Sequence, residues 1–76
     1  MTKFNIFFMA YYYVNKNAQE NGEHEVHTSA CSYLPDSSNL ISLGSFSNCA
    51  DAVRKAGEYY SNVDGCYYCC RSCNKG

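Results

Sequence analysis

Six cysteines in a chain of 76 residues are the feature that most limits how this sequence can fold. They are Cys31, Cys49, Cys66, Cys69, Cys70 and Cys73, and the last four form the stretch CYYCCRSC. A chain of this length buries only about 60% of the surface that its unfolded state exposes, so its hydrophobic core is small. Such domains commonly gain stability from disulfides, a metal ion or a partner chain. The cysteines therefore predict a cross-linked or metal-stabilised domain.

The first half of the chain predicts strands within one domain, which we place at residues 1–76 with 1–8 as a candidate extension before Met9. Phe4–Val14 is apolar or aromatic at nearly every position, which favours a strand. Because both of its faces are apolar, it is either a central strand with partly exposed tyrosines or a strand that meets another chain. HEVH, residues 24–27, predicts a short returning strand, and LISLGSF, residues 40–46, predicts a third.

A helix is expected after the third strand. Asn48 is a good N-cap, and Asp51 can answer it as in a capping box. Apolar residues then recur on one helical face, at Cys49, Ala52, Val53, Ala56 and Tyr60. Asn62 to Gly65 should end the helix, with Asp64-Gly65 as a turn. The predicted fold class is α+β: a small antiparallel sheet of two to three strands packed on one main helix, followed by a Cys-rich C-terminal turn or short helix.

The spacing of one histidine and three cysteines predicts a metal site. His27-x3-Cys31 and Cys66-x2-Cys69 are two short-range pairs of the kind that fills a structural zinc site. We therefore predict zinc bound by His27, Cys31, Cys66 and Cys69, with Cys70 as an alternative ligand in place of Cys69. Two other interpretations stay open: disulfides in an exported protein, or free thiols buried in the core.

The remaining cysteines are less constrained by the sequence. Cys49 lies at the expected start of the helix, where it is either a small core residue or a thiol made reactive by the helix N-terminus. Cys70 and Cys73 are core residues, disulfide partners or alternative ligands. A thiol redox protein using C-x2-C remains an alternative function, although such sites usually lie near a βαβ pattern, which is not evident here.

The stretch GEHEVHTSAC, residues 22–31, resembles the zinc-protease signature H-E-x-x-H with one residue missing. That signature needs two histidines at i and i+4 on one helical face. His24 and His27 are three residues apart, and on a strand they point to opposite faces. We therefore expect His24 to be a surface or hydrogen-bonding residue, and we predict no enzyme.

Charge and hydropathy indicate which partners and which location to expect for this chain. The six basic residues are scattered and are balanced by seven acidic ones, which disfavours nucleic acid as a partner. Tyr67, Tyr68, Arg71 and Lys75 nevertheless offer a small stacking and basic patch, so a nucleic-acid-binding module is a second alternative. No stretch approaches the about 20 apolar residues that span a bilayer, and a clear export signal is not evident. We expect a cytoplasmic chain away from membranes, with a protein partner or a second copy as its partner.

The chain is similar to a family of short, uncharacterised bacterial proteins. The shared residues are Y-x-V-N-x-N-A-Q (12–19), H-E-V-H-x3-C-x2-L-P (24–35), L-G-x-F (43–46) and D-G-C-x2-C (64–69). This resemblance covers nearly all of the chain after Met9 and implies no known activity or small-molecule substrate.

The order of elements also resembles, more distantly, the metal-binding domain of Ada-type DNA-repair proteins. By that resemblance His27, Cys31, Cys66 and Cys69 would be the ligands. In that family a cysteine at the first ligand position accepts a methyl group from a DNA phosphotriester, whereas His27 stands there in this chain. Asp64-Gly65 also replaces the usual Arg-Pro. The resemblance implies a fold and a metal, and it argues against methyl transfer. The sequence as a whole predicts a zinc-stabilised structural or interaction module without catalysis.

Overall fold

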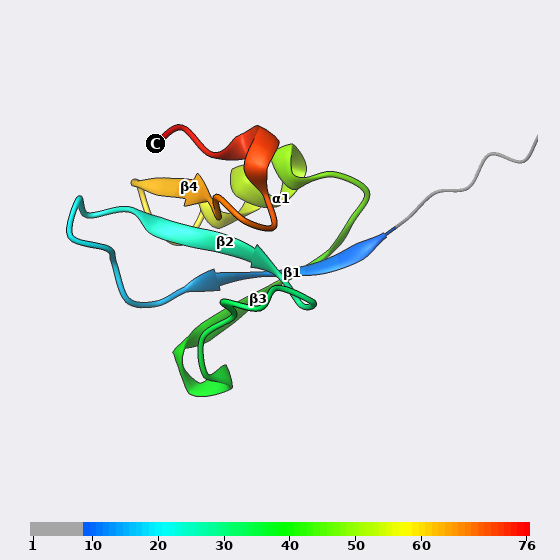
Figure 1. The fold of residues 1–76 in the computed structure, drawn as a ribbon, viewed down its shortest axis with the longest axis horizontal. Helices are drawn as coiled ribbons and strands as arrows, with labels where there is room; N and C mark the ends of the chain where they lie inside the picture. Colours follow the sequence, from blue (N-terminus) through cyan, green and yellow to red (C-terminus); the bar gives the residue numbers. More distant parts are fainter. Residues whose placement is uncertain (1–8) are drawn as a thin grey trace, which may run out of the picture.

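The computed structural model describes residues 9–76, and Figure 1 shows how their elements are arranged. In chain order the elements are β1 (Ala10–Asn15), β2 (His24–Thr28), the 3-10 turn η1 (Ser37–Asn39), β3 (Leu40–Phe46), α1 (Cys49–Ala56), β4 (Val63–Gly65) and the 3-10 turn η2 (Arg71–Cys73). The α+β class and the packing of α1 on the sheet are confirmed, since α1 contacts every strand of the sheet.

The sheet differs from the prediction in its strand count and in one strand direction. Over residues 9–76 it has four strands in the order β3-β1-β2-β4, and β4 runs parallel to β2 while the other pairs are antiparallel. Asp64 and Gly65 lie in β4 instead of forming a turn. Sequence reasoning missed β4 because it is only three residues long and contains Asp and Gly, which are rare in strands.

β1 is a central strand, paired with β2 on one side and β3 on the other. Tyr12 and Val14 point into the core, while Tyr11 on the opposite face is 61% exposed. The interpretation as a central strand with partly exposed tyrosines therefore holds for Ala10–Asn15. Of the rest of the predicted strand, Met9 lies before β1 and is not in a strand, and residues 4–8 lie outside the described residues.

A bulge in β3 breaks the simple alternation expected for LISLGSF. Tyr12 pairs with Gly44 and Tyr13 with Ser42, so Leu43 is an extra residue on the β3 side. Gly44 has a φ of 104°, a conformation that favours glycine and is typical of bulges. Because of the bulge, Leu43 and Phe46 both pack against the core, although strict alternation would separate them.

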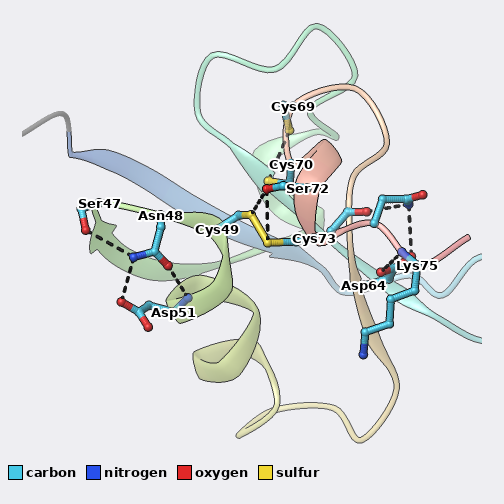
Figure 2. Close-up of a disulfide and its surroundings, with 12 residues drawn as sticks. Ser47, Asn48, Cys49, Asp51, Asp64, Cys69, Cys70, Ser72, Cys73 and Lys75 are labelled. Carbon is cyan, nitrogen blue, oxygen red and sulfur yellow. Dashed lines mark hydrogen bonds between the residues drawn. A yellow bond between two sulfur atoms is a disulfide. The ribbon is translucent and has the colours of Figure 1, made fainter.

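Helix α1 begins as predicted and ends earlier than the apolar spacing suggested. The Asn48 side chain accepts a hydrogen bond from the Asp51 backbone N–H at 2.9 Å (Figure 2), so the predicted N-cap is confirmed. The helix stops at Ala56 with Gly57 as its C-cap. Tyr60 still packs beside the core, from the segment that follows the helix. In the part of the chain that the structure describes, no helix is long and apolar enough to cross a membrane.

Candidate metal centre

The four residues predicted as metal ligands come together at one end of the sheet. One potential ligand atom from each of His27, Cys31, Cys66 and Cys69 lies within 4.8 Å of the others, close enough for all four to hold one metal ion. His27 and Cys66 are buried, and Cys31 and Cys69 are partly exposed. Residues far apart in the sequence therefore form one group between the core and the surface.

The parallel pairing of β2 with β4 places the first two members of this group side by side. Val26 is in register with Gly65, and the Cys66 backbone N–H donates to the Val26 carbonyl at 2.9 Å. His27 follows Val26 in β2, and Cys66 follows Gly65 at the end of β4. The site is thus set by the strand pair that sequence reasoning did not find.

Two tight loops bring in the other two members. After β2, the Cys31 backbone N–H donates to the Thr28 carbonyl at 3.2 Å, which turns the chain back toward the sheet. After β4, the Cys70 backbone N–H donates to the Cys66 carbonyl at 2.9 Å, which closes the loop containing Cys69. The second loop meets the end of β2 where the Thr28 backbone N–H donates to the Cys69 Sγ at 3.3 Å.

Backbone N–H groups are directed at all three sulfur atoms. Besides the bond to Cys69, the Tyr33 N–H donates to Cys31 Sγ and the Tyr68 N–H donates to Cys66 Sγ, each at 3.4 Å. Hydrogen bonds to the charged form of a group favour that form. Metal ions bind cysteine as the thiolate. The loops therefore have the donors that a set of metal-bound thiolates would use.

The His27 ring has one nitrogen available to a metal. Its Nε2 lies 3.6 Å from Glu25 Oε1, on the same strand face two residues earlier. Its Nδ1 is buried and has no hydrogen-bond partner. A buried polar atom without a partner is costly, and a metal at the sulfur cluster would satisfy it. At 3.6 Å the Glu25 carboxylate makes no hydrogen bond to Nε2, but it lies on the side of the ring where carboxylates support metal-bound histidines.

Burial favours the uncharged forms of two members of this group, His27 and Cys31, and so shifts the pKa of each. It lowers the pKa of His27, so the neutral ring that a metal needs is favoured. Burial also raises the pKa of the Cys31 thiol, and the hydrogen bond from the Tyr33 backbone N–H opposes this rise without cancelling it. Without a metal, Cys31 therefore favours the protonated thiol, and metal binding would release its proton.

Acid should destabilise the fold through His27. In the unfolded chain a histidine takes up a proton below about pH 6.5. In the folded chain burial lowers the pKa of His27, so the ring takes up its proton only at a lower pH. The unfolded state then binds more protons, so the free energy of unfolding falls as the pH drops below about 6.5. Urea unfolding at about pH 7.5 and 5.5 measures the loss, and a His24→Ala variant should show the same loss. Equal stability at both pH values would contradict this role of His27.

Two other residues named from the sequence lie outside the group. Cys70, the alternative ligand, is buried with its Sγ 3.8 Å from Cys69 Sγ, and burial with the neighbouring sulfur raises its pKa to about 12. The ring of His24 stacks on Tyr60 with centroids 3.6 Å apart, and its Nδ1 lies 2.8 Å from the Asn15 carbonyl oxygen. The expectation that His24 makes hydrogen bonds and is not a ligand agrees with this position.

The sequence did not identify a pairing between the remaining two cysteines. Cys49, at the start of α1, forms a disulfide with Cys73 in η2 (Figure 2). The sequence predicts a core residue or a reactive thiol at Cys49, and it leaves the role of Cys73 open. Their separation of 24 residues carries no local signal, so only the packing of η2 on α1 could reveal the pair.

Comparison with known proteins adds no assignment: no family model, no curated protein and no solved structure matches this chain. The function must therefore be inferred from the geometry of the chain itself.

Proposed function

We propose that this chain is a small zinc-stabilised module that binds a partner and catalyses no reaction. The observation that supports this most directly is the group of His27, Cys31, Cys66 and Cys69, whose ligand atoms lie within 4.8 Å of one another. One imidazole and three thiolates are a common ligand set for structural zinc. The orphaned His27 Nδ1 and the N–H donors at the sulfur atoms support the same choice.

The number of ligands is the reason for proposing a structural role. Catalytic zinc keeps one of its four positions for water or substrate, whereas structural zinc is filled by four protein ligands. Four protein ligands here would leave no open position. The ion would instead join the loop after β2 to the loop after β4, and its binding energy would act as folding energy.

Metal content is the measurement that tests this function. Purified, untagged protein should contain one zinc per chain by native mass spectrometry and elemental analysis. His27→Ala should lose the ion or bind it far more weakly, because one of the four ligands is removed. His24→Ala is the matched control and should keep full content, since His24 lies outside the ligand group. A wild-type chain without metal, also after refolding with zinc, would refute the proposal.

An exposed tyrosine cluster beside the metal centre supports the binding role. Tyr33 stacks on Tyr68 with centroids 4.2 Å apart, and Tyr67 meets Tyr68 edge-on at 5.2 Å. The three side chains are 49–64% exposed. Tyrosine is enriched at protein interfaces because its ring is apolar and its hydroxyl can remain hydrated. We propose a protein partner, first of all a second copy of this chain. Light scattering that finds only monomers at high concentration would exclude the second copy.

Nucleic acid is the second candidate partner, favoured by one contact. The Arg71 guanidinium lies 4.9 Å from the centroid of the Tyr67 ring, so the cluster combines stacking faces with a positive charge. Its weakness is charge, since the chain has six basic and seven acidic residues. A low-salt gel shift with single-stranded oligonucleotides tests it, and a shift lost in Tyr68→Ala would favour nucleic acid over protein.

A further inference from the structure

The disulfide between Cys49 and Cys73 adjoins a surface cavity and a hydroxyl group. The cavity has a volume of about 310 Å³, and it is lined by Ala50, Val53, Ser72, Cys73, Asn74 and Lys75. Ser72 Oγ lies 3.3 Å from Cys49 Sγ and 4.0 Å from Cys73 Sγ (Figure 2). Both cysteines are partly exposed. The disulfide is therefore placed where a small molecule can reach it.

The two sulfur atoms differ in their surroundings. Cys73 lines the cavity and Cys49 does not, so we take Cys73 as the side from which an incoming thiolate approaches. Cys49 is the first residue of α1, which has eight residues and an N-cap at Asn48. A helix N-terminus stabilises a thiolate, and the Ser72 hydroxyl could donate a hydrogen bond to it. Cys49 is thus the better leaving group and Cys73 the better point of attack.

We propose that the Cys49–Cys73 disulfide is a site of thiol–disulfide exchange with small anionic thiols, and that its reduction weakens the neighbouring metal centre. The second half rests on the proposed metal-binding function, whereas the first does not. Lys75 lines the cavity and supplies a positive charge, so a thiol carrying carboxylate groups is favoured over a neutral one.

The exchange balances as two displacements. The thiolate of a small thiol attacks Cys73 Sγ, a mixed disulfide forms on Cys73, and the Cys49–Cys73 bond breaks with its electron pair on Cys49 Sγ. A second small thiolate attacks the small-molecule sulfur of the mixed disulfide, which releases a small-molecule disulfide and the Cys73 thiolate. The protein gains two electrons, two small thiols lose one each, and the protein thiolates take up solvent protons according to their pKa values.

A short chain of contacts links this disulfide to the metal centre. The Cys73 backbone N–H donates to the Cys70 carbonyl, and the Cys70 N–H donates to the Cys66 carbonyl, both at 2.9 Å. Cys70 Sγ also lies 3.8 Å from Cys69 Sγ. The disulfide therefore holds η2 against α1, and η2 directly follows the loop that contains Cys66 and Cys69. Without it, this loop is held less firmly.

Hydrogen bonds to Asp64 also hold the C-terminal segment, so reduction of the disulfide should weaken metal binding without abolishing it. The buried Asp64 carboxylate accepts hydrogen bonds from the Asn74 side chain at 3.1 Å and from the Lys75 backbone N–H at 2.8 Å. These bonds hold the C-terminal segment against β4 after reduction. We therefore expect metal affinity to fall by roughly tenfold, the scale seen when groups that support ligands are lost.

Exchange is tested on the full chain as purified, with glutathione as the anionic thiol and 2-mercaptoethanol as the neutral one. Acid quenching, alkylation and peptide mass spectrometry should find the first mixed disulfide on Cys73, with Cys49 alkylated. Lys75→Gln should slow exchange with glutathione and leave exchange with 2-mercaptoethanol unchanged, while the control Lys55→Gln should change neither. The exchange proposal would be overturned if Cys49 and Cys73 were free thiols that oxidised glutathione does not convert to the disulfide. It would also be overturned if glutathione attacked the metal ligands first.

Coupling is tested by competition with a chromophoric zinc chelator. The oxidised wild type should bind zinc roughly tenfold more tightly than the chain whose Cys49–Cys73 bond glutathione has reduced. A Cys49→Ser, Cys73→Ser double variant should match the reduced chain and not respond to glutathione. Equal affinities of oxidised and reduced wild type would refute the coupling. A chain that binds no zinc in either state would refute the metal function instead, and the exchange result would still stand.

Discussion

Removing the metal should unfold the chain or lower its melting temperature by more than about 15 °C. In small zinc domains the apparent binding free energy is about 10–16 kcal/mol at neutral pH, and about 1 kcal/mol shifts the melting temperature of a domain this size by roughly 4–8 °C. Loss of even a few kcal/mol therefore produces a large shift. Circular dichroism melts with and without a strong chelator provide the measurement.

The physical reason is the small core of this chain. Among residues 9–76, the buried apolar side chains other than Tyr12 and Leu43 are small, namely Val14, Val26, Ala52, Ala56 and two cysteines. Without the ion, three thiol groups and an unpartnered His27 Nδ1 would lie between the two loops. Cys66→Ser should reproduce the chelator effect, because the buried sulfur ligand is lost. An unchanged melt in the presence of chelator would show that the fold does not depend on a metal.

Gly65→Ala should destabilise the fold by about 3 kcal/mol or more, at the upper end of the cost of overpacking. A Cβ at this position would lie 2.8 Å from both the Cys70 carbonyl oxygen and Cys73 Cβ, and 3.0 Å from Cys70 Cβ. These neighbours include backbone and a disulfide-bonded residue, so they cannot move independently. β4 and the turn formed by Cys70–Cys73 would have to move apart. Urea unfolding of the metal-loaded protein measures the cost.

Gly57→Ala is the matched control for this substitution. Gly57 has a φ of −61° at the end of α1, and its nearest contact for an added Cβ is the Arg54 carbonyl oxygen at 3.1 Å. Alanine adopts this backbone conformation readily, so the change should stay within about 1 kcal/mol. Similar costs for Gly57→Ala and Gly65→Ala would contradict the close approach between β4 and the Cys70–Cys73 turn.

The positions that sequence reasoning found are those with a local signal. Asn48 and Asp51 fixed the start of the helix because an N-cap depends on residues three apart. The pairs His27–Cys31 and Cys66–Cys69 were found because metal ligands recur at short spacings. The structure brings these four residues together, and that they bind a metal, and that the metal is zinc, is our proposal.

The positions that it missed depend on contacts between distant segments. β4 is a strand because it lies beside β2, and its own residues do not favour one. Gly65 was interpreted as a turn residue, whereas its need for glycine comes from the close approach of Cys70 and Cys73. The end of α1 at Ala56 was also missed, since the apolar spacing continued to Tyr60.

The sequence by itself determined the candidate ligand types, their pairwise spacing and the α+β class, because these follow from periodicity and from chemistry within a few residues. Only the tertiary structure decided that the two ligand pairs meet, since this requires β4 to pair parallel to β2 and to place Cys66 beside His27. It also decided how the six cysteines divide: four remain free thiols, three of them in the candidate metal group, and Cys49 forms a disulfide with Cys73. Thiols are chemically alike in the sequence, and their different positions in the fold give them different roles.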